Sequence, residues 1–474
     1  MQRFGTLALG IALAAATARA QETPTQRDAA KDVVAKMAVL QKEIDAAGWA
    51  TKLTAPNAAR DAVAARAKAL MDAELLALSD DITKHPEVGF KETRSIKLLI
   101  DYLKAHEFEV TQGVADLETA FVARYKRNNG KPVLGVIVEY DALRGTQGDF
   151  HGDQHSAQGP VGLAAAIAIA EYLTKSGTSG SVIVYGTPAE EMMPPPSKTV
   201  MHEAKVFDEA DVLVRSHSST ATQRAAPGFG TCCLNIDGVR YVFTGYPAHQ
   251  MTPWDGRNAL SALRLFFNNI DALRGTFRPE TRIQGIITEG GKAPNVVPDR
   301  AVGDFYIRYP DAEYLKQVRQ LVDDAARGAA SATGTKVKIE HYGSMRDGIS
   351  VASLNEVAFA YTKKFGGTKV QDVPGKPQGY EETGSVSSAI PGVGFSAHTA
   401  NGGFHTYEME QDALGDVGHK GFVIDAQGMA ALLYDFATRP EYRAAVKKEF
   451  DGLKALYAEY QNALRAAYRV PVVQ

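Results

Sequence analysis

Residues 148–170 have the sequence GDFHGDQHSAQGPVGLAAAIAIA. The first half is polar and rich in turn-forming residues, whereas the second half is the apolar face of a helix. Asp153 and His155 stand one residue apart just before that helix. A carboxylate oxygen and an imidazole nitrogen this close together are suitable first ligands for a divalent metal ion. An ordinary helix N-cap is the alternative, because Asp and Ser also favour that position.

The segments around this stretch predict an α/β fold. Residues 133–139, 181–185 and 212–215 are short runs that are almost entirely apolar, which is typical of strands buried on both faces of a sheet. A helix over 161–175 lies between the first two. We therefore expect a catalytic domain built on a mixed sheet, with helices on both faces.

Each predicted strand is followed by polar side chains of the kind that bind metals. Asp141 follows the first strand, Glu190 and Glu191 the second, and His217 the third. Ligand sites in α/β sheets lie beyond the carboxyl ends of the strands. Two adjacent carboxylates are costly there unless a cation is present. We expect the two glutamates to diverge, so that only Glu191 binds a given ion.

A second pattern begins near residue 234. Strand, helix, strand, strand, helix and strand follow one another within about 115 residues, as in a small α+β sandwich. We expect an inserted domain at 234–346, within a catalytic domain formed by 75–233 and 347–474. The expected elements are strands at 234–244, 281–289, 301–309 and 336–341 and helices at 257–273 and 311–330.

The first twenty residues resemble a signal peptide. Arg3 precedes an apolar run at 7–16 that is too short to span a bilayer, and Ala18-Arg19-Ala20 is a suitable cleavage site. We expect cleavage near Ala20 and an exported protein, periplasmic or secreted, that is not bound to a membrane. Residues 21–74 are expected to form an N-terminal helical segment.

Composition excludes some partners and covalent links. The 474 residues carry a net charge of −3, so nothing indicates a nucleic-acid partner. The only cysteines are the neighbours Cys232 and Cys233. Adjacent cysteines rarely pair with each other, because the geometry is strained. We expect both to be buried as small apolar residues.

Several motifs together resemble a known family. EYDAL at 139–143, DQH at 153–155 and PAEE at 188–191 look like those of the metal-dependent aminoacylase/carboxypeptidase family of peptidases (family M20). The chain looks closest to the branch of aminobenzoyl-glutamate hydrolases and N-acyl amino-acid amidohydrolases. Further landmarks, in the family order and within residues 75–435, are HPEVGF at 85–90, AH at 248–249, PNVVP at 294–298, HT at 405–406 and GHKG at 418–421.

This resemblance implies a centre with two divalent metal ions, Zn or Mn. In the family pattern, Asp153 would bridge the ions and Glu190 would be the general base for a metal-activated water. Asp141 would orient a ligand histidine from outside the coordination sphere. The remaining ligands implied by the resemblance are Glu191 and His405 for one ion and His155 and His217 for the other.

The resemblance also implies that the inserted domain is a lid that forms a homodimer. His249 would reach the active site of the partner subunit and hold the scissile carbonyl. Asn295 and Arg308 match lid positions that bind the substrate carboxylate, a task that suits the planar fork of arginine.

The implied function is hydrolysis of the amide bond of N-acyl amino acids or dipeptide-like substrates. A non-catalytic binding protein on the same fold and an esterase using the same site are the alternatives. A His151/Asp153 pair competes with the Asp153/His155 pair as the first two ligands, and His398 competes with His405. The chain departs from the branch in having Asp153 where the branch has cysteine. It also has Met-Met-Pro-Pro-Pro at 192–196, where the branch has small glycine-rich residues.

Overall fold

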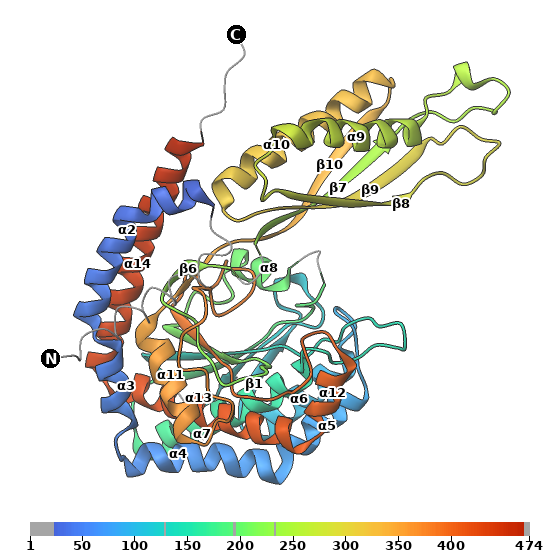
Figure 1. Cartoon of the computed structure of the whole chain (residues 1–474). Helices are drawn as coiled ribbons and strands as arrows, with labels where there is room; N and C mark the ends of the chain where they lie inside the picture. The colour runs from blue at the N-terminus through green and yellow to red at the C-terminus, as the bar shows by residue number, and fades with distance from the viewer. Residues whose placement is uncertain (1–22, 128, 193–195, 232–233, 469–474) are drawn as a thin grey trace.

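The computed structural model describes residues 23–127, 129–192, 196–231 and 234–468 (Figure 1). Three features of the sequence lie outside these residues. They are the expected signal peptide with its cleavage site, the cysteine pair at 232–233, and most of the Met-Met-Pro-Pro-Pro segment at 192–196. Within the described part of the chain, no helix combines the length and the apolar character needed to cross a membrane.

The larger sheet is mixed and has six strands in the order β1-β2-β4-β3-β5-β12. Strands β4, β3, β5 and β12 are parallel, whereas β1 and β2 are antiparallel to their neighbours. The strands are β1 (Phe108–Gln112), β2 (Phe121–Tyr125), β3 (Val133–Val138), β4 (Ser181–Gly186), β5 (Val212–Ser216) and β12 (Gly392–Phe395).

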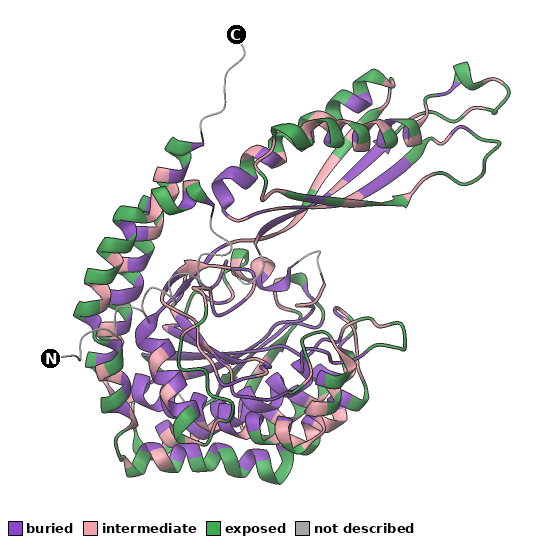
Figure 2. Ribbon diagram, in the orientation of Figure 1, coloured by how far each residue is buried: buried purple, intermediate pink, exposed green. Residues whose placement is uncertain are grey.

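Burial explains why this sheet forms. All six residues of β3 are buried, as the apolar run at 133–139 predicts. Helices cover one face, and the helix α8 (Ser197–Glu203) and residues near Tyr380 pack on the other (Figures 1 and 2). The covering helices include α4 (Ala58–Leu70), α5 (Leu76–Lys84), α6 (Thr93–Ala105), α7 (His155–Ser176) and α13 (Asp416–Thr438). The expected mixed sheet with helices on both faces is confirmed.

Helix α7 begins at His155, six residues earlier than the start that the sequence pattern predicts. The predicted start at 161 leaves Gly159 and Pro160 before the helix. Gly159 instead allows close packing within the helix, because a Cβ atom there would lie 2.7 Å from the Leu99 side chain. His155 therefore lies in the first turn of a buried helix, which restricts where its ring can point.

The second sheet has four antiparallel strands in the order β10-β7-β9-β8, with α9 (Ala259–Leu273) and α10 (Ala312–Ala332) on one face (Figure 1). Its elements follow the strand and helix order that the sequence predicts. The strands are β7 (Asn235–Thr244), β8 (Arg282–Glu289), β9 (Arg300–Tyr309) and β10 (Lys336–Met345). We call this sheet and its two helices the lid.

The two ends of the described chain lie side by side as helices α2 (Pro24–Ile44) and α14 (Pro440–Ala467) (Figure 1). They connect the lid to the rest of the molecule: Arg465 pairs with Glu313 at 2.8 Å and Tyr468 donates to Asp311 at 2.5 Å. The remaining elements include α3 (Ala46–Thr54), a π-helical turn (Met71–Leu75), α11 (Ala352–Lys364), α12 (Tyr407–Ala413) and the strand pair β6 (Gly228–Gly230) and β11 (Gly348–Ser350).

Candidate active site

Sheet topology brings ligand-type side chains together at one edge. Strands β4 and β5 lie on either side of β3 and run parallel to it. The chain crosses from one side of β3 to the other between them, which is where ligands bind in open α/β sheets. The residues that follow these strands include Glu139, Asp141, Glu190, Glu191 and His217.

One group of potential metal ligands contains Asp153, Glu191 and His405, each with a ligand atom within 4.8 Å of the others. The Nε2 atom of His405 lies 3.2 Å from Asp153 Oδ2 and 3.6 Å from Glu191 Oε2. Burial raises the pKa of Glu191 to about 7, whereas His405 helps to hold the pKa of Asp153 below its ordinary value against burial. These three residues are the set that the resemblance implies for one ion.

A second group contains His155, His217 and Glu139. The two imidazole rings have centroids 5.7 Å apart. The Nε2 atom of His155 lies 3.7 Å from Glu139 Oε2, and both side chains are buried. The two histidines are expected together from the sequence, which gave no indication of a role for Glu139. Asp153 is not part of this second group.

Asp141 holds both groups in place. One of its oxygens lies 3.0 Å from Nδ1 of His155, and the other accepts a hydrogen bond from the backbone N–H of Glu191 at 2.9 Å. A carboxylate only accepts, so Nδ1 of His155 carries a proton, and the neutral form of the ring presents a lone pair at Nε2. The contact to His155 agrees with the orienting role expected for Asp141.

Glu190 points into the same cluster. Its carboxylate lies within 4.8 Å of ligand atoms of both His155 and Glu191. The expectation that Glu190 and Glu191 diverge is therefore wrong. They follow β4 in a turn, not in extended backbone, so the alternation of strand side chains does not apply. Burial, and next the neighbouring Glu382, raise the pKa of Glu190 well above its ordinary value.

The backbone is strained at three points of the site. Gln154, Ala189 and His405 have φ angles of 55°, 55° and 61°. Non-glycine residues seldom adopt this left-handed conformation, which often persists at functional sites because the surroundings hold it. Buried Glu92 supports the turn before Glu190 by accepting a hydrogen bond from the Ala189 N–H at 2.8 Å.

Four charged side chains form a buried ion ring beside the cluster. Lys198 and Arg215 each pair with both Glu139 and Glu382. Burial opposes ionisation of Glu139, but Arg215 and Lys198 hold its pKa well below the ordinary value. The only signal of this ring in the sequence is that carboxylates stand at the end of an otherwise apolar strand. Its partners were missed, because α8 and the loop at 381–383 are distant in sequence.

The charges and unpaired atoms of this region fit bound metal. Six carboxyl groups converge on this region beside the cationic side chains of Lys198 and Arg215. Buried charges are stable only when paired or bound to metal. The carboxylates are Asp141, Glu139, Asp153, Glu190, Glu191 and Glu382. Asp153 Oδ1, Glu191 Oε1 and His155 Nε2 are buried without a hydrogen-bond partner.

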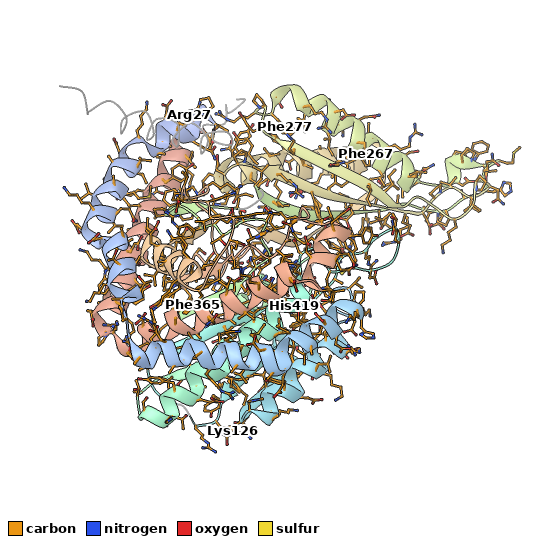
Figure 3. All side chains as sticks on the ribbon, turned by 60° about the horizontal axis from the view of Figure 1, so that its bottom comes forward. Arg27, Lys126, Phe267, Phe277, Phe365 and His419 are labelled. Atoms are coloured by element: carbon orange, nitrogen blue, oxygen red, sulfur yellow. The ribbon has the colours of Figure 1, made fainter. Side chains whose placement is uncertain are left out.

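The competing histidines lie outside these groups. His151 is buried, and burial together with nearby His155 lowers its pKa to about 3. His398 has its Nδ1 atom 2.8 Å from the Thr368 hydroxyl. Neither belongs to a group of potential ligands among the described residues. His419, labelled in Figure 3, contacts Asp80 on α5 at 2.8 Å.

The structure does not bring the predicted lid residues into the cluster of the same chain. His249 and Asn295 are exposed in neighbouring loops beyond the end of the lid sheet, and His249 pairs with Val296 there (Figure 1). Arg308 lies half-buried on β9, with its guanidinium 5.6 Å from the ring of Tyr306.

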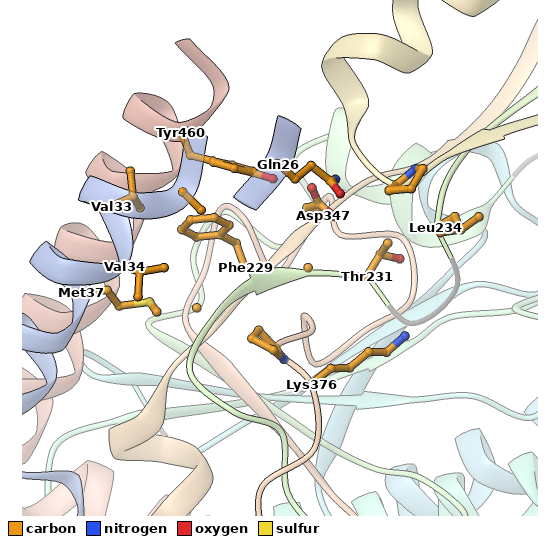
Figure 4. A pocket seen from close by; sticks show the side chains of 15 residues that line it. Gln26, Val33, Val34, Met37, Phe229, Thr231, Leu234, Asp347, Lys376 and Tyr460 are labelled. Atoms are coloured by element: carbon orange, nitrogen blue, oxygen red, sulfur yellow. The ribbon is translucent and has the colours of Figure 1, made fainter. Parts of the chain in front are cut away.

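A separate cavity lies between α2, β6 and the residues where the chain enters the lid (Figure 4). Its walls are mainly apolar, with Val33, Met37, Phe229 and Tyr460 among the lining residues and Asp347 and Lys376 as charged members. None of the potential metal ligands lines it, so this cavity is not part of the site at the ends of the strands.

Comparisons with known proteins agree with this architecture. Residues 234–333 match the peptidase dimerisation domain of family M20. The chain is 28% identical over 409 residues to Xaa-Arg dipeptidase of Homo sapiens, covering 82% of this chain and 91% of the human protein. It is 33% identical over 277 residues to one of the subunits of p-aminobenzoyl-glutamate hydrolase of Escherichia coli strain K12, covering 55% and 56% of the two chains.

Solved structures show the same fold. An aminobenzoyl-glutamate utilization protein from Klebsiella pneumoniae superposes with a TM-score of 0.54 at 17% identity, covering 78% of this chain and 99% of that one. A dinuclear metal-binding peptidase of family M20 from Bacillus subtilis superposes with a TM-score of 0.52 at 18% identity, covering 77% and 98%. The expected resemblance is thereby confirmed: the chain is similar to peptidases and hydrolases of family M20 and carries the dimerisation domain of that family at residues 234–333.

Proposed function

We propose that this hydrolase cleaves the amide bond of dipeptides or N-acyl amino acids, with two divalent ions and with Glu190 as the general base. The observation that carries the proposal is the cluster of buried carboxyl groups and imidazoles, with its unpaired ligand atoms. Such a cluster is unstable without cations and offers enough donors for two of them.

Asp153, Glu191 and His405 would hold one ion, and His155 and His217 would contribute to the other. Ions bound there would polarise the scissile carbonyl and lower the pKa of water, and either Zn or Mn suits this mixture of oxygen and nitrogen donors. Asp153 contacts His405 of one group, and His217 and His155 of the other group lie close enough to lower its pKa, which supports a bridging role.

Glu190 is suited to take a proton from the attacking water. Its carboxylate reaches the same space as Glu191 and His155. Its raised pKa makes it a stronger base than an exposed glutamate, and a base is most effective when its pKa is near the working pH. The same group can then pass the proton to the leaving nitrogen.

The substrate class follows from what the relatives share. The human relative is named for dipeptides that end in arginine, and the bacterial relative is named for an aroyl derivative of glutamate. Both compounds have an amide that joins an acyl group to an amino acid. We therefore propose that this chain also releases a free amino acid. Arg308, on a lid strand, would bind the carboxylate of that amino acid together with Asn295.

The test is a substrate panel assayed for release of free amino acid. The panel should contain Xaa-Arg and Xaa-Glu dipeptides, N-acetyl and aroyl amino acids, and matched esters. We expect hydrolysis of at least one amide, loss of activity with a chelator, and recovery with Zn²⁺ or Mn²⁺. Cleavage of esters alone would favour the esterase. Tight substrate binding without any turnover by metal-loaded protein would favour the binding protein.

We also propose that the protein is a homodimer formed through the lid. Strand β8 is an open edge of the lid sheet, and it exposes Ile286 and Ile287. Tyr246, Met251 and Trp254 are exposed in the loop that carries His249. Apolar edges and patches of this kind are normally covered in the assembled protein. The match of residues 234–333 to a peptidase dimerisation domain also supports a dimer formed through the lid.

We propose catalytic segments at 75–233 and 347–474 around a lid at 234–346, supported by the two separate sheets. We propose export with cleavage near Ala20, which the mass of the mature N-terminal peptide would test.

A further inference from the structure

Glu139 Oε2 and His155 Nε2 face each other in the buried cluster. The two atoms are 3.7 Å apart, buried, and without hydrogen-bond partners. When His155 is neutral and Nδ1 donates to Asp141, its Nε2 atom presents a lone pair. The carboxylate oxygen also presents a lone pair. A divalent ion between the two atoms would then bind both lone pairs and replace any proton held on Nε2.

The separation is suited to an ion and not to a hydrogen bond. An N–H···O bond has its heavy atoms about 2.7–3.2 Å apart. Two ligand atoms that are each about 2.1 Å from one tetrahedral ion lie about 3.4 Å apart. The observed 3.7 Å is closer to the second value. His217 belongs to the same group, and its Nδ1 atom faces the Ser218 carbonyl at 3.2 Å, which leaves Nε2 free to bind.

The ion ring sets the direction of the Glu139 carboxylate. Its other oxygen, Oε1, contacts both Lys198 Nζ and Arg215 Nη1, the latter at 2.7 Å. Both cations are also paired with Glu382, and Lys198 is buried. They are therefore not available to bind substrate. Their geometric effect is to hold Oε1 away from the histidines and to turn Oε2 toward them.

We propose that Glu139 is a further metal ligand, which completes the ion site of His155 and His217, and that Lys198 and Arg215 are its positioning residues. This inference rests on the proposed function, because it concerns the same metal centre. With Glu139, the ion of His155 and His217 has a carboxylate in addition to the bridging Asp153. A second hard oxygen donor makes the His155/His217 site more tolerant of Mn²⁺.

Metal binding to the full-length protein tests this ligand directly. Chelated protein is titrated with Zn²⁺ and with Mn²⁺ by calorimetry, and bound metal is counted by plasma mass spectrometry. Wild type is expected to bind two ions. Glu139→Gln keeps the size but loses the charge, and we expect it to bind one ion with wild-type affinity and the other about 100-fold more weakly. Lys198→Met should weaken the same ion by about 10–100-fold, as loss of an outer partner does.

Glu203→Gln is the control, because it removes an exposed carboxylate on α8 that lies outside both the ion ring and the groups of potential ligands. It should bind both ions with an affinity close to that of wild type. If Glu139→Gln binds two ions with unchanged affinity, or if Glu203→Gln weakens the same ion equally, Glu139 is not a ligand. Circular dichroism shows which variants are folded, and anomalous diffraction from metal-soaked wild-type crystals locates the ions relative to Oε2.

The proposed function can fail separately from this inference. If wild-type protein binds no divalent ion, the whole metal centre is wrong. If wild type binds two ions and hydrolyses an amide while Glu139→Gln also keeps both ions, only the ligand assignment of Glu139 fails.

Discussion

At the scale of single residues, Glu190 and Asp425 show how environment decides what a carboxylate does. Glu190 lies in the ligand cluster, where burial and Glu382 raise its pKa. Asp425 lies on α13 behind the sheet, where it accepts hydrogen bonds from the Ser216 hydroxyl and the Ala397 N–H. Glu190 is therefore suited to act as a base, whereas Asp425 has a structural role.

Glu190→Gln should lower kcat by about 10²–10⁴, since the amide cannot accept a proton from water. Metal content should be unchanged, because Glu190 is outside the two sets of residues assigned to the ions. Steady-state kinetics and metal analysis of the same preparation measure the two effects. Glu203→Gln, an exposed carboxylate on α8, is the control and should behave as wild type. Loss of an ion in Glu190→Gln would make this residue a ligand and not the base.

Asp425→Asn should change how stability depends on pH. Burial raises the pKa of Asp425 to about 7 in the folded protein, whereas an unfolded aspartate titrates near ~4. The folded state binds the extra proton, so the contribution of Asp425 to stability is fully present below about pH 4 and is lost as the pH rises toward 7. The asparagine variant does not titrate, so its free energy of unfolding should rise relative to that of wild type, on the order of a few kcal/mol, as the pH rises through this range.

Urea unfolding of metal-free protein at several pH values measures this gain. Asp451→Asn, which removes an exposed carboxylate from α14, should keep the wild-type profile. Parallel profiles for wild type and Asp425→Asn would show that Asp425 is not protonated in the native state at neutral pH.

At the scale of elements, close packing of α7 on β3 aligns the two segments of backbone that carry His155 and Glu139. Gly162 allows the approach. A Cβ atom at this position would lie 2.4 Å from Val138 Cγ1 and 3.0 Å from Val136 Cγ1. Because these valines belong to a central strand buried on both faces, they have little room to move.

Gly162→Ala should therefore destabilise the protein by about 1–3 kcal/mol, the usual cost of overpacking, although alanine is the better helix former. Gly328→Ala is the matched control. Gly328 lies in helix α10 with open space around its Cα, so alanine should stabilise by up to about 1 kcal/mol. Chemical denaturation gives both values. Stabilisation by both substitutions would mean that α7 does not pack this closely on β3.

At the scale of the whole molecule, the lid separates His249 from the metal cluster of its own chain. His249 is exposed in a loop beyond the lid sheet, and strand β8 is an open edge of that sheet (Figure 1). A two-fold dimer formed along this edge brings the same loop of one subunit toward the other subunit. An imidazole donor that reaches the partner's site would stabilise the developing oxyanion, a contribution of about 2.7–4 kcal/mol.

Mixing two inactive variants tests this arrangement. Glu190→Gln and His249→Ala subunits should each be inactive or nearly so, and their mixture should regain activity, because one site of the mixed dimer has both residues intact. Activity after co-refolding, with exchange followed by native mass spectrometry, measures the recovery. If mixed dimers form and remain inactive, His249 acts within its own chain or has no role.

The sequence alone determined which segments form the main strands and helices and which metal-binding side chains follow them. Hydrophobic runs predict strands β3, β4 and β5 because a central strand must be apolar along its whole length. Polar side chains directly after such strands are costly to bury unless they bind a partner, and this cost predicts Asp141, Glu191 and His217 as site residues. The order of strands and helices in the lid was also predictable from local pattern.

Tertiary structure decided what depends on contacts between distant residues. The ion ring pairs Lys198 with Glu382, 184 residues further along the chain, and no local pattern indicates it. Helix α7 begins at His155, and the close approach of its Gly159 to Leu99 is a contact between distant residues that the local pattern did not indicate. The convergence of Glu190 with Glu191 depended on a strained turn at Ala189. Local pattern determines which residues are buried or lie at strand ends, whereas partners of charged groups are chosen by packing, because electrostatic pairing acts through space and not along the chain.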